Sequence, residues 1–127
     1  MFRIFMASAA FFGLSGVMLG ALGSHALKTK LSVAALAAFQ TAVQYQLLHA
    51  VVLLALAIWS WHKTQKLVVC SGLFFMIGIL LFSGSIYCLT LANLGLGIVT
   101  PIGGVFFMLG WLMLFISAFQ STAKAAQ

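Results

Sequence analysis

Long stretches without a charged side chain are the strongest constraint in this sequence. Residues 67–123 contain no Asp, Glu, Lys or Arg, and residues 4–24 form a second charge-free stretch. The chain is 65% hydrophobic and 5% charged, whereas soluble domains carry roughly 25% charged residues. A small soluble protein must cover a large surface with polar groups, which this chain lacks. We therefore predict a single transmembrane domain over residues 1–127, with lipid around most of it.

The first apolar stretch predicts a spanning helix at about 4–24, since one crossing needs about 20 apolar residues. A cleaved signal peptide is the alternative, because Arg3 precedes the run and Ala21-Leu22-Gly23 faintly resembles a cleavage site. The apolar region of a signal peptide has about 7–15 residues. The greater length here favours a retained helix.

The second predicted helix spans about 40–61 and follows a near-interfacial helical lead-in at 32–39. Ser32 is suited to cap this lead-in, whose alanine-rich sequence favours helix but is only weakly hydrophobic. Trp59 and Trp61 fall at the other end of the helix, which is typical of the aromatic belt at a membrane interface.

The last charge-free stretch is too long for one crossing and suits two, at about 67–92 and 101–120. We expect the break within 93–97, because Asn and Gly end helices in the left-handed conformation. Thr100 and Pro101 predict the N-cap and the first position of the last helix. Short connections favour antiparallel neighbours. The predicted fold class is all-α: a polytopic membrane protein with four transmembrane helices in one antiparallel bundle.

All six charged side chains are basic, and they lie singly or in pairs at the ends of the apolar stretches. Nucleic-acid binding requires a clustered basic face, so we expect no nucleic-acid partner. Four crossings divide the charges between the two sides of the membrane, with Arg3, Lys63, Lys66 and Lys124 on one side and Lys28 and Lys30 on the other. The positive-inside rule then predicts a multi-pass protein of the bacterial inner (plasma) membrane with both termini in the cytoplasm.

A stripe of small residues runs along the first predicted helix at spacings of three and four. Its members are Ala9, Gly13, Gly16, Gly20 and Gly23. Such stripes let helix backbones approach closely in lipid. We interpret the stripe as a helix-packing face within the bundle, and a dimer face is the alternative.

Polar side chains concentrate on the second predicted helix, and a smaller group lies on the third. This candidate intramembrane polar cluster consists of Thr41, Gln44, Tyr45, Gln46, His49, Ser83, Ser85 and Tyr87. Thr41, Tyr45 and His49 recur at intervals of four and share a helix face. Unpaired polar groups are costly in lipid, so the cluster should point into the bundle, the third-helix members facing the second helix. Interhelical hydrogen bonding is one interpretation, and a solute or proton path in which His49 changes charge near neutral pH is the other.

The absence of Asp and Glu removes groups that several membrane mechanisms need. A proton-coupled exporter usually relies on an embedded carboxylate, and hydrolytic catalysis would lack its orienting acid. The histidines His25, His49 and His62 fall at different depths, and Cys70 and Cys88 lie far apart in one helix. Neither a metal site nor a disulfide is therefore predicted. We expect no catalytic residues, no cofactor and no enzyme activity.

Short blocks of sequence, in order along the chain, carry a family resemblance. They are residues 20–27 (GALGSHAL), 45–50 (YQLLHA), 81–87 (LFSGSIY), 100–104 (TPIGG) and 110–112 (GWL). Together they resemble the YgdD-like family of small bacterial inner-membrane proteins, a domain of unknown function with mitochondrial relatives. The resemblance covers essentially the whole chain. It implies a four-helix membrane protein with a retained first segment, and it supplies no reaction, ligand or catalytic residue.

These features favour an integral inner-membrane protein that is a non-enzymatic accessory or assembly factor acting through helix packing. Its expected partners are the lipid bilayer and either further copies of itself or a larger membrane complex. The alternative is a small oligomeric channel or carrier for a small solute or protons, using the polar face of the second helix. A lipid-binding or holin-like membrane perturber is a third hypothesis, but the sequence lacks the densely charged tail we would expect of one.

Overall fold

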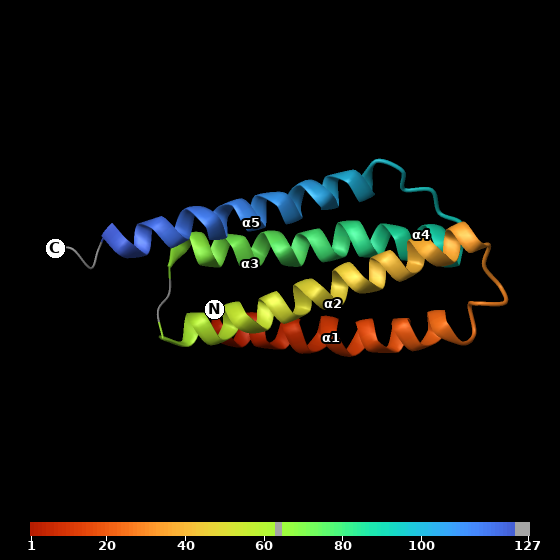
Figure 1. Ribbon diagram of the computed structural model, residues 1–127, viewed down its shortest axis with the longest axis horizontal. Coiled ribbons are helices and arrows are strands. Elements are labelled where there is room, and N and C mark those ends of the chain that lie inside the picture. The colour runs from red at the N-terminus through yellow and green to blue at the C-terminus, as the bar shows by residue number, and fades with distance from the viewer. Residues whose placement is uncertain (63–64, 124–127) are drawn as a thin grey trace.

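The computed structural model describes residues 1–62 and 65–123, and helices make up most of it (Figure 1). The elements in chain order are α1 (Phe2–Ser24), α2 (Val33–His62), α3 (Lys66–Gly78), the π-helical turn η1 (Ile79–Ser83), α4 (Gly84–Ala92) and α5 (Val99–Ala123). An apolar segment in lipid must satisfy its backbone hydrogen bonds internally, which a helix does. In this part of the chain four helices are long and apolar enough to cross a membrane, namely Phe2–Ser24, Val33–His62, Lys66–Ala92 and Val99–Gln120. The prediction of an all-α protein with four spanning helices is confirmed.

α2 is one continuous helix, in which the predicted lead-in and the predicted span are joined without a break. The Ser32 hydroxyl accepts a hydrogen bond of 3.2 Å from the backbone N–H of Ala35. This is the bond that an N-cap side chain makes with the third helical residue. Ser32 therefore caps α2 as predicted.

The turn between α4 and α5 follows the sequence prediction at its start and differs at its end. Asn93 ends α4 in the left-handed conformation, with φ 54° and ψ 25°. α5 begins at Val99, so Thr100 is not its N-cap and Pro101 is its third residue. The first-turn N–H groups of a helix have no acceptor within it, so proline is tolerated at any of these positions.

α1 and α2 pack against each other and run in opposite directions. Phe2 lies against Trp61 at the beginning of α1, with ring centroids 4.5 Å apart, and Gly23 lies against Phe39 at its end. α2 packs on its other side against α3, η1 and α4, and α5 packs against α3 and η1. Figure 1 accordingly shows the rod formed by α3, η1 and α4 between α5 and the α1–α2 pair.

Aromatic rings pack directly on glycines where α3 and α5 meet. A Cβ added at Gly110 of α5 would lie 2.6 Å from Cε1 of Phe75, and one added at Gly78 of α3 would lie 2.5 Å from Cδ1 of Phe107. Both rings are buried. Small residues in lipid permit this close approach, and van der Waals packing then stabilises the bundle.

The basic residues that the structure describes lie at the two ends of the bundle. α1 begins and α5 ends at one end, while the turns after α1 and α4 lie at the other (Figure 1). Arg3 and Lys66 therefore share the first end, and Lys28 and Lys30 lie in the turn at the second. The remaining two cations of the topology prediction, Lys63 and Lys124, fall outside the residues that the structure describes.

Candidate functional site: the intramembrane polar cluster

Gln46 is the most highly connected side chain of the candidate cluster. It lies on α2 with only 3% of its surface exposed. Its amide nitrogen Nε2 donates to the carbonyl oxygen of Phe12 at 2.9 Å and to the hydroxyl of Ser15 at 2.8 Å, both on α1. Its amide oxygen Oε1 accepts a bond of 2.9 Å from the hydroxyl of Tyr87 on α4. One amide thus joins three helices and uses both of its N–H groups.

His49, one turn further along α2, is held by both of its ring nitrogens. Nδ1 lies 2.8 Å from the carbonyl oxygen of Tyr45, and Nε2 lies 3.3 Å from the indole nitrogen of Trp111 on α5. Because an indole N–H can only donate, Nε2 must accept, and the ring proton then lies on Nδ1. The imidazole also stacks on Phe107 with ring centroids 3.8 Å apart. In this arrangement neither nitrogen is free to bind a metal or to pass on a proton.

The third-helix members of the cluster divide between two neighbours. Ser83, at the end of η1, is fully buried and donates to the carbonyl oxygen of Ala42 on α2 at 2.8 Å. Ser85 turns the other way, and its hydroxyl lies 2.6 Å from that of Thr100 on α5. A π-turn holds one more residue than an α-turn and so changes the direction in which the following side chains point. Ser83 and Tyr87 thus face α2, while Ser85 faces α5.

Three members of the cluster are exposed on the outer side of α2. Thr41 donates to the carbonyl oxygen of Ala37 in its own helix at 3.0 Å. Gln44 is exposed, and Tyr45 is 41% exposed with its ring against Phe82. Residues eight apart in an α-helix differ in direction by about 80°. The face predicted from intervals of four is therefore broad, with Thr41 at its outer edge and His49 at its inner edge.

The groups that complete the cluster were not identified from the sequence. They are Ser15 and the Phe12 carbonyl on α1, Thr100, Phe107 and Trp111 on α5, and the buried Ser71, which donates to the Gly110 carbonyl at 2.9 Å. A polar side chain inside a charge-free apolar run was the available signal for Ser15 and Ser71. Backbone carbonyls carry no such signal.

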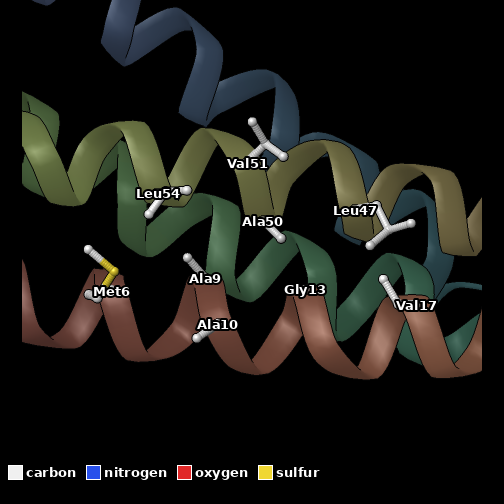
Figure 2. Close-up of a pocket in the computed structure, with 9 residues that line it drawn as sticks. All are labelled: Met6, Ala9, Ala10, Gly13, Val17, Leu47, Ala50, Val51 and Leu54. Atoms are coloured by element: carbon white, nitrogen blue, oxygen red, sulfur yellow. The ribbon is translucent and has the colours of Figure 1, made fainter.

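Most of the small-residue stripe on α1 packs against α2 of the same chain. A Cβ added at Gly16 would lie 2.7 Å from Leu47, one at Gly20 would lie 3.3 Å from Val43, and Ala9 belongs to the buried core. Gly23 lies against Phe39. At Gly13, by contrast, an added Cβ would meet no atom within 4 Å. Gly13 lies on an open groove between α1 and α2 (Figure 2).

Residues 1–62 and 65–123 contain no cluster of side chains that could bind a metal ion. No three His, Cys, Asp or Glu side chains there lie close enough to hold an ion. His25 follows the end of α1 and His62 ends α2, so the histidines are spread along the bundle. The buried members of the polar cluster therefore form hydrogen bonds between helices.

The fold and the paired polar groups define the class of this chain, a small polytopic membrane protein. A family model described as "Protein of unknown function (DUF423)" matches residues 19–104. The chain belongs to the DUF423 family. It is 36% identical over 123 residues to the UPF0382 inner membrane protein YgdD of Escherichia coli strain K12, covering 96% of this chain and 94% of that protein. No solved structure matches.

Relatives also occur in staphylococci. A UPF0382 membrane protein of Staphylococcus saprophyticus is 40% identical over 119 residues, which cover 93% of this chain and 98% of the relative. One from Staphylococcus aureus is 38% identical over 119 residues, covering 93% and 97%. The family resemblance found in the sequence is confirmed, and the relatives' names indicate membrane proteins and no reaction.

Proposed function

We propose that this chain is a non-enzymatic accessory or assembly protein that acts through helix packing. The observation that supports this proposal is that the buried members of the polar cluster bond to groups of the same chain. Gln46 joins α1 to α2 and α4, His49 joins α2 to α5, and Ser83 joins η1 to α2. Because those polar groups are bonded within the bundle, the outer faces of the helices are the surfaces available to other molecules.

The outer face of α5 is one exposed surface that is available for contact with another membrane protein. Met108, Leu112 and Phe115 on this helix are 64%, 51% and 64% exposed. Helices associate in lipid by van der Waals packing and hydrogen bonds, because lipid tails remove the hydrophobic driving force. The expected partners are the surrounding bilayer and either further copies of the chain or a larger membrane complex.

A channel or carrier that uses the polar face of α2 is not favoured. Both nitrogens of His49 are engaged, its ring is stacked on Phe107, and both N–H groups of Gln46 are used. A solute or proton moving along this face would have to break several of these hydrogen bonds at once. Lipid offers no replacement partners, so the free energy of those bonds would be lost.

We further propose that the protein lies in the bacterial inner membrane with both termini in the cytoplasm. The Escherichia coli relative is named an inner membrane protein. Arg3 and Lys66 lie at the end of the bundle where α1 begins. By the positive-inside rule this end would face the cytoplasm, and Lys63 and Lys124 would add to the same side.

Photo-crosslinking in native membranes tests the accessory role. A benzophenone amino acid is placed singly at Met108 and Phe115 on α5, and at Phe11 and Leu14 on α1 as positions on another exposed surface. We expect a discrete protein adduct from one helix and none from the other, since a specific partner covers one face. Two differently tagged copies then distinguish a homo-oligomer from a complex with another protein. Absence of a protein adduct at all four positions would contradict the proposal.

A further inference from the structure

Gly13 is the member of the small-residue stripe whose small size helix packing does not explain. α2 side chains lie directly over Gly16 and Gly20, so a larger residue at either position would force Leu47 or Val43 to shift. Gly13 is half-buried, yet nothing in the bundle occupies the space above it. The missing side chain leaves a hollow on the lipid-facing surface.

The hollow is part of a groove between α1 and α2 with a volume of about 370 Å³. Small-molecule sites have volumes of about 300–1,000 Å³, so the groove is at the small end of this range. Figure 2 shows that the residues lining it come from two helices, and all of them are apolar. They are Met6, Ala9, Ala10, Gly13 and Val17 of α1 and Leu47, Ala50, Val51 and Leu54 of α2. The groove fits a slender apolar chain that lies along the helices.

A cation stands at one end of this groove. Arg3 precedes Met6 by three residues and Ala10 by seven, a spacing that places all of them on one side of α1. Arg3 is exposed, and the whole chain contains no Asp or Glu to pair with it. Trp61, 66% exposed at the end of α2, lies beside Phe2 and marks the same level of the membrane. The counterion of Arg3 must come from outside the polypeptide side chains.

We propose that the groove between α1 and α2 binds one acyl chain of an anionic phospholipid whose phosphate pairs with Arg3. A guanidinium binds phosphate through parallel N–H groups and is more weakly hydrated than an ammonium, so it suits an interfacial phosphate. The acyl chain then runs from Arg3 past Met6 and lies over Gly13. The proposal goes beyond the accessory role and does not depend on it.

Charge favours a lipid over a second copy of this chain as the occupant. Two copies meeting through this groove about a twofold axis would each present the same surface to the other. Such a contact would bring the two Arg3 ends toward one another with no carboxylate to compensate them, and like charges repel. An anionic lipid supplies the missing charge.

Native mass spectrometry of the full chain, released from nanodiscs of equal phosphatidylglycerol and phosphatidylcholine with the same acyl chains, tests the proposal. We expect one retained phosphatidylglycerol and a preference over phosphatidylcholine of about fivefold, which corresponds to about 1 kcal/mol for one charge-assisted pair. Gly13→Leu should fill the groove and abolish retention of both lipids. Arg3→Gln should keep one bound lipid and remove the preference.

Matched controls separate the groove from general effects of substitution. Gly104→Leu makes the same change at a helical glycine of α5 that also has open space around it, and Lys28→Gln removes a cation at the opposite end. Both should behave as the unsubstituted chain. Ala10→Leu fills the groove from its edge and replaces Gly13→Leu if that variant does not fold. Retention unchanged in a folded groove-filled variant, equal retention of the two lipids by the unsubstituted chain, or a dimer lost on Gly13→Leu would each overturn the proposal.

Discussion

The indole N–H of Trp111 donates to Nε2 of His49, with the two nitrogens 3.3 Å apart and 62 positions apart in sequence. This bond joins α5 to α2 across the bundle and fixes the neutral tautomer of the imidazole. His49 therefore acts as a structural contact between these two helices. The stability of the bundle should therefore depend on it.

Trp111→Phe should destabilise the bundle, because it removes the donor and leaves the buried Nε2 of His49 without its partner. We expect a loss of about 1 kcal/mol in the free energy of unfolding, the usual scale for an unsatisfied buried acceptor. Unfolding in mixed detergent micelles measures it. The double variant Trp111→Phe with His49→Phe should recover part of the loss, whereas Trp59→Phe, an exposed tryptophan, should change little. Equal losses for both tryptophan variants would argue against the bond.

Gln46→Leu should have a larger effect, because Gln46 forms three hydrogen bonds to other helices. With about 0.6 kcal/mol for each bond between membrane helices, we expect a loss of roughly 2 kcal/mol. The same unfolding measurement applies. Gln44→Leu is the matched control on the exposed side of α2 and should be neutral or slightly stabilising in lipid. The reverse order of the two effects would contradict the assignment of Gln46 as the link between helices.

Gly110→Ala should weaken the contact between α3 and α5. The added methyl group would lie 2.6 Å from the ring of Phe75, which is fully buried, so the ring or the helix must shift. Overpacking of this kind costs about 1–3 kcal/mol. Gly104→Ala places the same methyl group in open space on the same helix. It should be neutral or stabilising, because alanine has the higher helix propensity, and a loss as large as that of Gly110→Ala would contradict this interpretation.

Much of the fold could be predicted from the sequence, because the charge-free runs and their ends reflect the solvent around each helix. The Asn93 turn was also predictable, since asparagine tolerates the left-handed conformation. The start of α5 was not, because proline fits any first-turn position and Thr100 has a competing bond to Ser85.

The candidate site was only partly predictable. Gln46 and His49 stand out as polar residues in an apolar helix, and the structure buries both. Their partners, the Phe12 carbonyl and Trp111, depend on the register between helices far apart in sequence. Local patterns do not contain that register. Thr41 is exposed because an α-helix has 3.6 residues per turn, so residues spaced four apart point in gradually different directions.

Topology reporters test the proposed orientation. Alkaline phosphatase, which is active only outside the cytoplasm, should be active when fused after Thr29 and inactive when fused after Gln65 or at the C-terminus. This pattern follows from four crossings with Arg3 and Lys66 on the cytoplasmic side. A complementary fluorescent fusion that matures only in the cytoplasm should give the opposite pattern. Activity of the phosphatase at the C-terminus would contradict the orientation.

The tautomer of His49 in the folded protein tests whether the interior polar groups serve helix packing. Nitrogen NMR of histidine-labelled protein in lipid nanodiscs at neutral pH, with His25 and His62 replaced by Gln, reports each ring nitrogen separately. We predict a protonated Nδ1 and an unprotonated Nε2 whose resonance shifts in Trp111→Phe. A doubly protonated ring, or one exchanging freely between tautomers, would mean that His49 is available to carry protons and would contradict a purely structural role for it.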